Sequence, residues 1–346
     1  MNSLGIGVIG CGRIAQSHLK SVDAHKHARA VAVIDVIPER AEETAKRFQI
    51  PKVCRSLDEL LSLPEVDAVI VCTPPAAHTA PTLAALSAGK HVLCEKPFAL
   101  DVGEAEQMTE AAEKAGRWLS VCSARARCGA AARKARELIL DGAIGTPYHI
   151  RSTAFRQRGR PGIDFWQDAT WFQDKSQAGG GALMDLGVYQ IDLMLWLLGN
   201  PKVKSVLATT FQGVGAPPPP GVRQDVEDHV TAMMVLDNGA SAVLEQGWST
   251  NMAGADSLMV WGSKAGLRFR PLTMISEPMV DGHLTETRLL DVDDHDSTGH
   301  GDVTTAFINA VIEGREPLTP AREALQITKV IDAIYRSAAS GTAVAP

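Results

Sequence analysis

The chain has 346 residues, a length too great for one ordinary hydrophobic core, and it predicts about two domains. Hydrophobic residues make up 45% and charged residues 21%, which is typical of a globular protein rather than a disordered one. The net charge is −6 and no long run of one sign occurs, which argues against a nucleic-acid or anionic-membrane surface.

The first ten residues contain no basic segment, no long apolar segment and no small-residue cleavage site. We therefore interpret them as a first strand and not as a signal peptide. No window approaches a stretch of about 18 uninterrupted apolar residues, so no membrane span is expected. All six cysteines lie before residue 130 and none forms a Cys-x-x-Cys pair. We expect buried free thiols in a cytoplasmic protein, with disulfides or a zinc site as the less favoured alternatives.

Short apolar runs alternate with amphipathic helical stretches over the first 120 residues. The runs are GIGVIG (5–10), AVAVIDV (30–36), DAVIVCT (67–73), HVLCEK (91–96) and WLSVCS (118–123). Continuous apolar strands separated by helices predict a parallel sheet with helices on both faces. Residues 1–123 are therefore predicted to form a doubly wound α/β domain.

The pattern changes after about residue 145. A helix, AARKARELILDG, ends at Gly142, and strand-like runs then follow one another with few helices between them. Asn238-Gly239 between two of these runs is a strong hairpin signal. Residues 124–346 are predicted to form an α+β domain with a largely antiparallel sheet, the opening helix on that sheet and helices at the C-terminal end. The last helix is a candidate for packing back on the first domain.

Residues 10–15, GCGRIA, fit the dinucleotide-binding pattern G-x-G-x-x-G/A between a strand and a helix. Glycine lets the backbone approach a pyrophosphate, and the helix N-terminus supplies free N–H groups. Asp35 ends the second apolar run, where an acceptor for a ribose hydroxyl belongs. Two aliphatic residues follow it, which favours NAD over NADP, although Arg13 and Arg40 keep NADP open. The alternative is a simple Gly-rich turn with a surface Asp. The expected cofactor contacts here are Gly10, Gly12, Arg13, Ile14 and Asp35.

The run at 91–96 ends with Lys96. In an open parallel sheet, ligands bind beyond the carboxyl ends of the strands, so Lys96 is expected where a nicotinamide and a substrate meet. Thr73 and Pro74 follow the preceding run at the same level, with His78 just beyond. His78 is read equally well as a capping or core histidine, and Lys96 has the alternative of an exposed lysine. The further expected cofactor contacts are Thr73, Pro74, His78, Glu95 and Lys96.

Residues 179–199, GGGALMDLGVYQIDLMLWLLG, form an apolar helical pattern with a polar stripe. Asp185, Tyr189 and Asp192 interrupt it at spacings of four and three, which places all three on one helical face. A buried polar stripe is costly unless a partner satisfies it. The pattern therefore indicates that this face meets something polar.

Several segments occur here in the order seen in the glucose–fructose oxidoreductase/inositol dehydrogenase family, and the chain resembles that family over essentially its whole length. The segments are GIGVIGCGRIA, Asp35, DAVIVCTPPAAH, GKHVLCEKP and GGGALMDLGVYQID. The resemblance implies an N-terminal Rossmann domain and a C-terminal domain with an open-faced mixed sheet, through which homodimers or homotetramers pack. It also implies NAD(P)-dependent oxidation or reduction of a sugar, cyclitol or polyol. Lys96 matches the family's catalytic lysine, Asp185 its substrate-binding acid and Asp192 a second acid.

Most members carry histidine four residues after the acid, where this chain has Tyr189. In this it is similar to the tyrosine-containing aldose and dihydrodiol dehydrogenases. We expect the polar face to look at substrate and nicotinamide, across from Lys96. Our hypothesis is that Tyr189 accepts the substrate's hydroxyl proton, assisted by Lys96, while Asp185 binds a neighbouring hydroxyl. A phenol is a poor base at neutral pH, but a close ammonium favours the phenolate. The alternative is that these side chains make only local hydrogen bonds.

Two loops supply further candidates. The loop at 156–177 is rich in Arg and Trp, and aromatic faces stack on sugars, although an interface or surface loop is an even alternative. The expected substrate contacts from this loop are Arg156, Trp166 and Trp171, with Arg158 as a further candidate. The acidic loop at 291–300 matches no metal-loop spacing, so we expect no metal site, and His300 is a weak candidate for the active site.

The leading interpretation is an NAD-dependent dehydrogenase, with a cyclic aldose oxidised at C1 to a lactone as the first candidate reaction. An inositol substrate loses weight because histidine is absent at position 189. The alternatives are a keto-sugar reductase that uses the same residues in reverse, and a non-catalytic NAD-binding regulatory relative. Intact Lys96, Asp185 and Tyr189 argue against the last, because a sensor needs only the glycine loop.

Overall fold

A computed structural model describes residues 3–276, 285–289, 292 and 299–346. The chain forms two compact units, each described here by itself. The first comprises Met1–Arg125 and Thr298–Thr328, and the second comprises Ala126–Ser297 and Lys329–Pro346. The domain boundary at residue 123 stays a prediction. Residues 298–328, far along the sequence, belong to the first unit.

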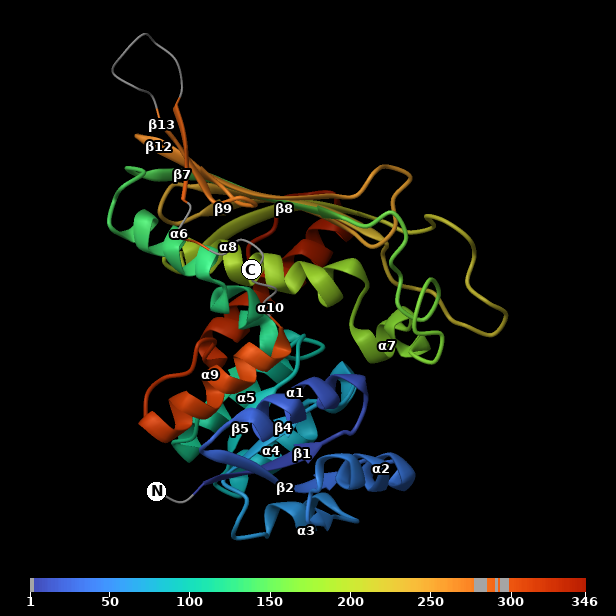
Figure 1. The fold of residues 1–346 in the computed structure, drawn as a ribbon. Helices are drawn as coiled ribbons and strands as arrows, with labels where there is room; N and C mark the ends of the chain where they lie inside the picture. Colours follow the sequence, from blue (N-terminus) through green and yellow to red (C-terminus); the bar gives the residue numbers. More distant parts are fainter. Residues whose placement is uncertain (1–2, 277–284, 290–291, 293–298) are drawn as a thin grey trace. The chain divides into compact units, whose positions relative to one another are not determined.

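The first unit contains a six-stranded sheet in which every pairing is parallel (Figure 1). The strand order is β3-β2-β1-β4-β5-β6, a doubly wound arrangement that confirms the predicted fold class. The strands are β1 (Leu4–Ile9), β2 (Ala28–Ile34), β3 (Lys52–Val53), β4 (Ala68–Val71), β5 (His91–Cys94) and β6 (Leu119–Val121). All but β3 lie in or overlap the apolar runs, because strands covered on both faces are apolar throughout.

Successive strands are connected by the helices α1 (Arg13–Ala24), α2 (Pro38–Phe48), α3 (Leu57–Leu61), α4 (Thr79–Ser87) and α5 (Val102–Ala115), with a short 3₁₀ turn, η1 (Pro75–Ala77), before α4. The late helix α9 (His300–Glu313) also belongs to this unit. Helix α5 begins where the Asp101 carboxylate accepts the N–H of Glu104 at 2.8 Å, and it ends at the left-handed Gly116. Helix α9 packs against α1 and β5, so a segment from late in the sequence packs beside the parallel sheet.

The second unit contains an eight-stranded sheet in the order β14-β13-β12-β11-β7-β10-β9-β8. Among the strands that the structure describes, only β7 and β10 pair in parallel, so the sheet is largely antiparallel as expected. The strands are β7 (Pro147–Phe155), β8 (Val203–Phe211), β9 (His229–Leu236), β10 (Ser241–Gly247), β11 (Ala255–Gly262), β12 (Ala265–Arg268), β13 (Thr273–Ser276) and β14 (Thr285–Arg288). The hairpin at Asn238-Gly239 is confirmed: it joins β9 to β10, with φ +87° at Gly239.

One face of this sheet is covered by helices and the other carries exposed side chains. Helix α8 (Val188–Leu197) packs on β7 and β10, and α6 (Ala130–Leu140) packs on α8, on the same side in Figure 1. The last part of α10 (Ala321–Ser340) reaches β8, where Ser337 Oγ accepts the N–H of Ala208 at 2.9 Å. On the opposite face, Leu207, Met233 and other apolar residues are exposed. The shorter elements of this unit are η3 (Thr170–Gln173) and α7 (Lys175–Ala178).

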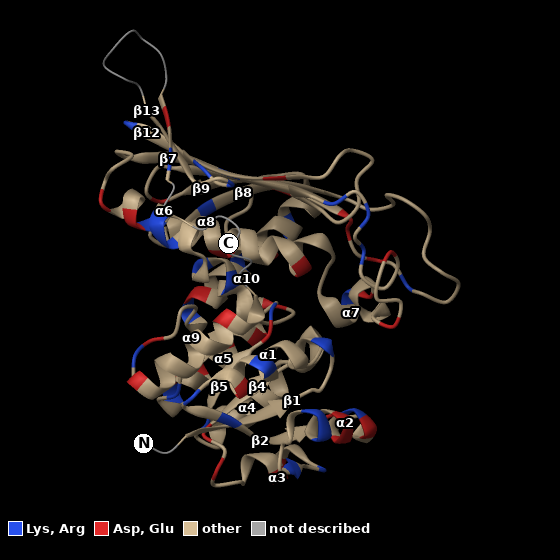
Figure 2. Cartoon of the chain, in the orientation of Figure 1, with Lys and Arg blue, Asp and Glu red and all other residues tan. Residues whose placement is uncertain are grey.

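Two general expectations can be compared with the structure. Cys128 is half-buried and the other five cysteines are buried, all six with free thiols, as predicted. Lys, Arg, Asp and Glu are interspersed along elements such as α2 (Figure 2). Within the described residues, no helix combines the length and apolarity needed to cross a membrane.

Candidate functional site

The glycine loop between β1 and α1 has the geometry of a phosphate-binding turn. Gly10 has φ +92°, and a Cβ there would lie 2.9 Å from the backbone carbon of Cys72, so only glycine fits. A Cβ on Gly12 would meet nothing within 4 Å, which leaves its backbone approachable. Gly12 is also the N-cap of α1 and, having no side chain, gives the N–H groups of this helix end no side-chain cap. These residues fit the pyrophosphate of a dinucleotide.

Asp35 is held directly against this loop. One carboxylate oxygen accepts the N–H of Cys11 at 2.7 Å and the other accepts the N–H of Ile37 at 2.8 Å. The side chain is therefore fixed at the carboxyl end of β2, where a ribose hydroxyl would be bound. Arg13 is exposed, and Gly12 and Ile14 are half-buried, around the same turn.

The segment after β5 is held on both sides of Lys96, which is itself half-buried. The backbone N–H of Lys96 donates to the Glu95 carboxylate at 3.1 Å, and the carbonyl of Pro97 lies 2.9 Å from Nδ1 of His78. The other ring nitrogen of His78 lies 2.9 Å from the carbonyl of Thr73, which is half-buried at the end of β4. His78 thus ties two strand ends together from a buried position, while Pro74 is exposed.

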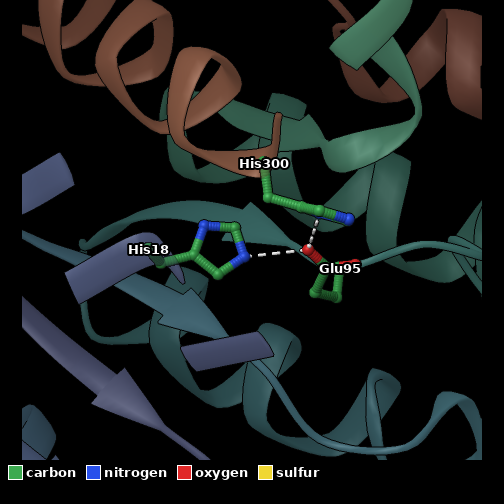
Figure 3. Close-up of side chains that lie close together, drawn as sticks. All are labelled: His18, Glu95 and His300. Carbon is green, nitrogen blue, oxygen red and sulfur yellow. Dashed lines mark hydrogen bonds and ion pairs between the residues drawn. The ribbon is translucent and has the colours of Figure 1, made fainter. Parts of the chain in front are cut away.

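Glu95 is buried beneath this loop and uses its carboxylate inside the first unit. Its Oε1 lies 2.8 Å from His18 Nε2 and 2.9 Å from His300 Nδ1 (Figure 3). Burial raises the pKa of Glu95, but the charges and hydrogen bonds of His300 and His18 outweigh that effect and hold the pKa well below its usual range. His300 therefore meets the residue next to Lys96, a link that its loop position in the sequence did not reveal.

The expected polar helix is divided into two parts. Residues Leu183–Gly187 form a π-helical turn, and α8 follows from Val188. Asp185, on the π turn, accepts the indole N–H of the fully buried Trp248 at 3.0 Å. Tyr189 is almost completely buried. Trp248 is a contact to Asp185 that sequence reasoning missed, because 63 residues separate the two along the chain.

Asp192 has a buried partner of opposite charge within the second unit. Its side chain is 0% exposed and forms a two-point ion pair with Arg127, whose Nε donates to Oδ2 at 2.9 Å. The Arg127 guanidinium also lies 5.7 Å from the ring centre of Trp196. Asp185 and Asp192 thus have different partners, and the partner of Asp192 carries the opposite charge.

Gly180 and Gly181 lie in close packing, whereas Gly179 has φ +81° at the end of α7. A Cβ on Gly181 would lie 2.0 Å from the carbonyl oxygen of Glu227, and one on Gly180 would lie 1.9 Å from the hydroxyl oxygen of Tyr335. The buried Glu227 carboxylate accepts the N–H groups of Gly181 and Leu183 at 2.9 Å each and the Tyr335 hydroxyl at 3.0 Å. Burial raises the pKa of Glu227. Glu227 therefore caps the segment that carries Asp185.

Replacing Gly181 with Ala is expected to destabilise the protein by about 1–3 kcal/mol, the usual cost of overpacking, because the new methyl group would meet a backbone oxygen. Urea unfolding at pH 7 measures this cost. Gly103→Ala is the matched control, since Gly103 lies near the start of α5 and the only close contact of its new Cβ is a side-chain oxygen at 3.4 Å. Equal midpoints for the two variants would contradict the prediction.

The loop at 156–177 is anchored within the second unit. The Arg160 guanidinium is buried, donates to Asp164 at 3.0 Å and also reaches the carbonyl of Ala216 at 2.9 Å. Arg158 is tied to residues 249–251 through its guanidinium. The predicted substrate contacts from this loop are accessible: Arg156 and Trp166 are exposed, and Trp171 is half-buried.

The three residues predicted from the sequence to be catalytic come from both units. Lys96 belongs to the first unit, whereas Asp185 and Tyr189 belong to the second. The roles of these residues, and those of the predicted cofactor and substrate contacts, stay predictions. The acidic loop at 291–300 lies mostly outside the described residues, with His300 at the start of α9 as the exception among its histidines.

Two family models match the two halves of the chain. Residues 4–123 match the oxidoreductase family with an NAD-binding Rossmann fold, and residues 132–268 match the GFO/IDH/MocA C-terminal domain. The D-glucoside 3-dehydrogenase of Escherichia coli K12 is 30% identical over 351 residues, which cover 99% of this chain and 97% of that protein.

Solved structures agree over the whole chain. An oxidoreductase domain protein from Kribbella flavida is 27% identical with a TM-score of 0.85, covering 100% of this chain and 99% of that one. A levoglucosan dehydrogenase in complex with NADH and L-sorbose is 25% identical with a TM-score of 0.87 and the same coverage. The chain belongs to the GFO/IDH/MocA family of oxidoreductases, and its N-terminal part is an NAD-binding Rossmann domain.

Proposed function

We propose that the protein is an NAD-dependent dehydrogenase that oxidises a ring hydroxyl of a sugar or a related polyol. The observation that carries the proposal is the glycine loop: it leaves the N-terminus of α1 approachable beside a fixed Asp35 carboxylate. The names of the relatives, which act on a D-glucoside, levoglucosan and inositol, support a sugar or cyclitol as substrate. A homo-oligomer that packs through the open sheet face, and a cytoplasmic location, stay expectations.

Bound NAD supplies the acceptor for the hydride that leaves the carbinol carbon. The residues of the chain are proposed to handle the proton. Tyr189 accepts the proton of the reacting hydroxyl, and the Lys96 ammonium stabilises the phenolate and orients that hydroxyl. Asp185, fixed by the indole of Trp248, binds a neighbouring hydroxyl. The same groups serve a keto-sugar reductase in the reverse direction.

Two positions on the sugar ring compete. The tyrosine four residues after Asp185 is a feature that this chain shares with the aldose dehydrogenases it resembles, which favours oxidation at C1 to a lactone. The E. coli relative is named a D-glucoside 3-dehydrogenase and covers nearly the whole chain, which favours C3 of a glycoside. A methyl glucoside discriminates between them, because its C1 oxygen is blocked while C3 stays free.

The test is NADH absorbance with purified protein, NAD and a panel of glucose, xylose, methyl glucosides, levoglucosan and myo-inositol. Turnover of glucose with none of methyl glucoside supports C1, and comparable turnover of both supports C3. NADH with the matching keto-sugars tests the reductive direction. Absence of turnover with every compound, together with tight NAD binding, would favour the non-catalytic regulatory alternative and overturn the proposal.

A further inference from the structure

The carboxylate of Glu95 is enclosed by two histidines from distant parts of the chain. Glu95 follows β5 and is 4% exposed, His18 lies on α1 and is fully buried, and His300 is the first residue of α9. Both rings direct a nitrogen at the same oxygen, Oε1 (Figure 3). We call these three residues the histidine–glutamate cluster.

Hydrogen bonding around the cluster gives each ring nitrogen of His18 a partner. Nδ1 lies 2.6 Å from the Thr304 hydroxyl, whose single proton can point to this nitrogen or to the carbonyl of His300 at 3.0 Å. Nε2 lies 2.8 Å from the Glu95 carboxylate, which only accepts hydrogen bonds, so Nε2 is the donor of this contact. The ring of His18 is therefore held from both sides and directs an N–H at Oε1.

A metal ion is the competing explanation, because two histidines and a glutamate are a zinc-type ligand set and their ligand atoms lie within 4.8 Å of one another. The distances favour protons. In a tetrahedral zinc site with bonds of about 2.1 Å, the ligand atoms are about 3.4 Å apart. Both N···O distances here, 2.8 and 2.9 Å, are those of charge-assisted hydrogen bonds.

The cluster is joined directly to the backbone of Lys96. The second oxygen of Glu95 accepts the Lys96 N–H at 3.1 Å, and the Glu95 N–H continues the sheet by donating to the carbonyl of Val71 at 3.0 Å. Beyond Lys96, His78 holds the carbonyl of Pro97. The backbone of Lys96 thus lies between two buried histidine-centred attachments.

We propose that Glu95 is a positioning residue for Lys96, held in place by N–H groups of His18 and His300, so that α1 and α9 fix the carboxyl end of β5. The proposal rests on the catalytic role proposed for Lys96. Its physical basis is that a buried carboxylate with three donors has one favoured position, and the Lys96 N–H is one of those donors.

Other titratable groups also surround the Glu95 carboxylate. The groups that act on it or respond to it are His18 from α1, His300 from α9, Cys72 after β4, Cys94 at the end of β5, Cys122 after β6 and His78 before α4. Burial raises the pKa of each of the three thiols, so these are neutral at pH 7. None of these three thiols therefore adds a charge beside Glu95.

Nitrogen-15 NMR of protein labelled at histidine tests the hydrogen bond from His18 to Glu95 without any substrate. At pH 7, Nε2 of His18 is expected to show the shift of a protonated nitrogen, with the signal assigned by its loss in His18→Gln. An Nε2 without a proton would overturn the proposal. So would one equivalent of zinc in the purified protein, measured by elemental analysis, that is lost in Glu95→Gln.

The positioning role is tested on Lys96 itself. The purified wild type, Glu95→Gln and His300→Asn are treated with an amine-acylating reagent between pH 6 and 9, and the labelling rate of Lys96 is measured by mass spectrometry against the exposed Lys114. The dependence of the Lys96 labelling rate on pH is expected to differ between Glu95→Gln and the wild type. His300→Asn should differ less from the wild type, because the asparagine amide keeps an N–H donor close to the former position of the His300 Nδ1. An unchanged Lys96 profile in Glu95→Gln would overturn the proposal.

The matched control lies on the same pair of helices. His25 Nε2 and Asn309 Oδ1 are 3.1 Å apart and also join α1 to α9, but the pair does not include Glu95. Asn309→Ala should therefore leave the Lys96 labelling profile unchanged.

Activity gives a second measurement. Glu95→Gln is expected to lower kcat about 10–100-fold, the equivalent of one charged hydrogen bond, while the Kd for NADH stays within about twofold. If the NMR and labelling results are as expected but no sugar is oxidised, the proposed function is wrong and the positioning role of Glu95 stands. If sugar is oxidised but the Lys96 labelling profile of Glu95→Gln equals that of the wild type, the positioning role is wrong and the proposed function stands.

Discussion

Tyr189→Phe is expected to lower kcat about 10²–10⁴-fold, the usual contribution of a positioned acid–base group. Phenylalanine keeps the packing of this almost fully buried ring and removes only the hydroxyl that is proposed to accept the substrate proton. The Kd for NADH should stay within about twofold of wild type, because the glycine loop is unaltered. Steady-state kinetics at pH 7 with the best substrate of the panel, together with NADH fluorescence titration, measure both quantities.

The chain offers a matched control for this substitution. Tyr148 lies on β7 with 53% of its surface exposed, so Tyr148→Phe should leave kcat unchanged. Lys96→Met is expected to reduce kcat to a similar extent as Tyr189→Phe, and the double variant should lose little more, because the two groups are proposed to act as one unit. Turnover by Tyr189→Phe at the wild-type rate would remove this residue from the proton-transfer role.

Replacing Arg127 with Met is expected to destabilise the protein by about 3–5 kcal/mol, because it leaves the fully buried Asp192 carboxylate without its cation. Methionine keeps most of the apolar stem that packs by Trp196. The urea midpoint of the second unit's transition, followed by tryptophan fluorescence, reports the loss. The double variant Arg127→Met/Asp192→Leu should recover much of it, since no charge then remains buried.

A surface ion pair of the same unit is the control. Arg268 donates to Glu286 at 2.9 Å across β12 and β14, and both side chains are exposed. Arg268→Met should cost no more than about 1 kcal/mol, because solvent screens exposed pairs. If Arg127→Met were as mild as this control, Asp192 would have to be satisfied by other donors, and its assignment as a charge-compensated structural acid would be wrong.

Features that repeat along the chain or obey a local rule could be predicted without the structure. The apolar runs foretold five of the six strands of the parallel sheet, because strands covered on both faces exclude polar residues. Strand β3 was not predicted, because a strand of two residues is too short to show an apolar pattern. The glycine loop, Asp35 beside it and the Asn238-Gly239 hairpin followed from backbone rules that apply to glycine wherever it occurs.

The polar helix shows where such rules end. Helical spacing alone placed Asp185, Tyr189 and Asp192 on one face, and it could not distinguish an acid near a site from an acid in a buried ion pair. That distinction depends on Arg127, which lies 65 residues away along the chain. The glycine triplet was likewise legible as a motif, but its physical reason is the approach of Glu227 and Tyr335 from later segments.

The sequence by itself thus determined the fold class, the nucleotide-type loop and the residue types available for chemistry, because each depends on neighbours a few positions away. Only the tertiary structure decided which partner each buried polar group has. His18, Glu95 and His300 are separated by 77 and 205 residues along the chain, yet they share one carboxylate oxygen. A buried charge without a partner is costly, so each buried charged group needs one. Which residue becomes that partner depends on how whole helices and strands pack, and the spacing of residues along the sequence does not show this.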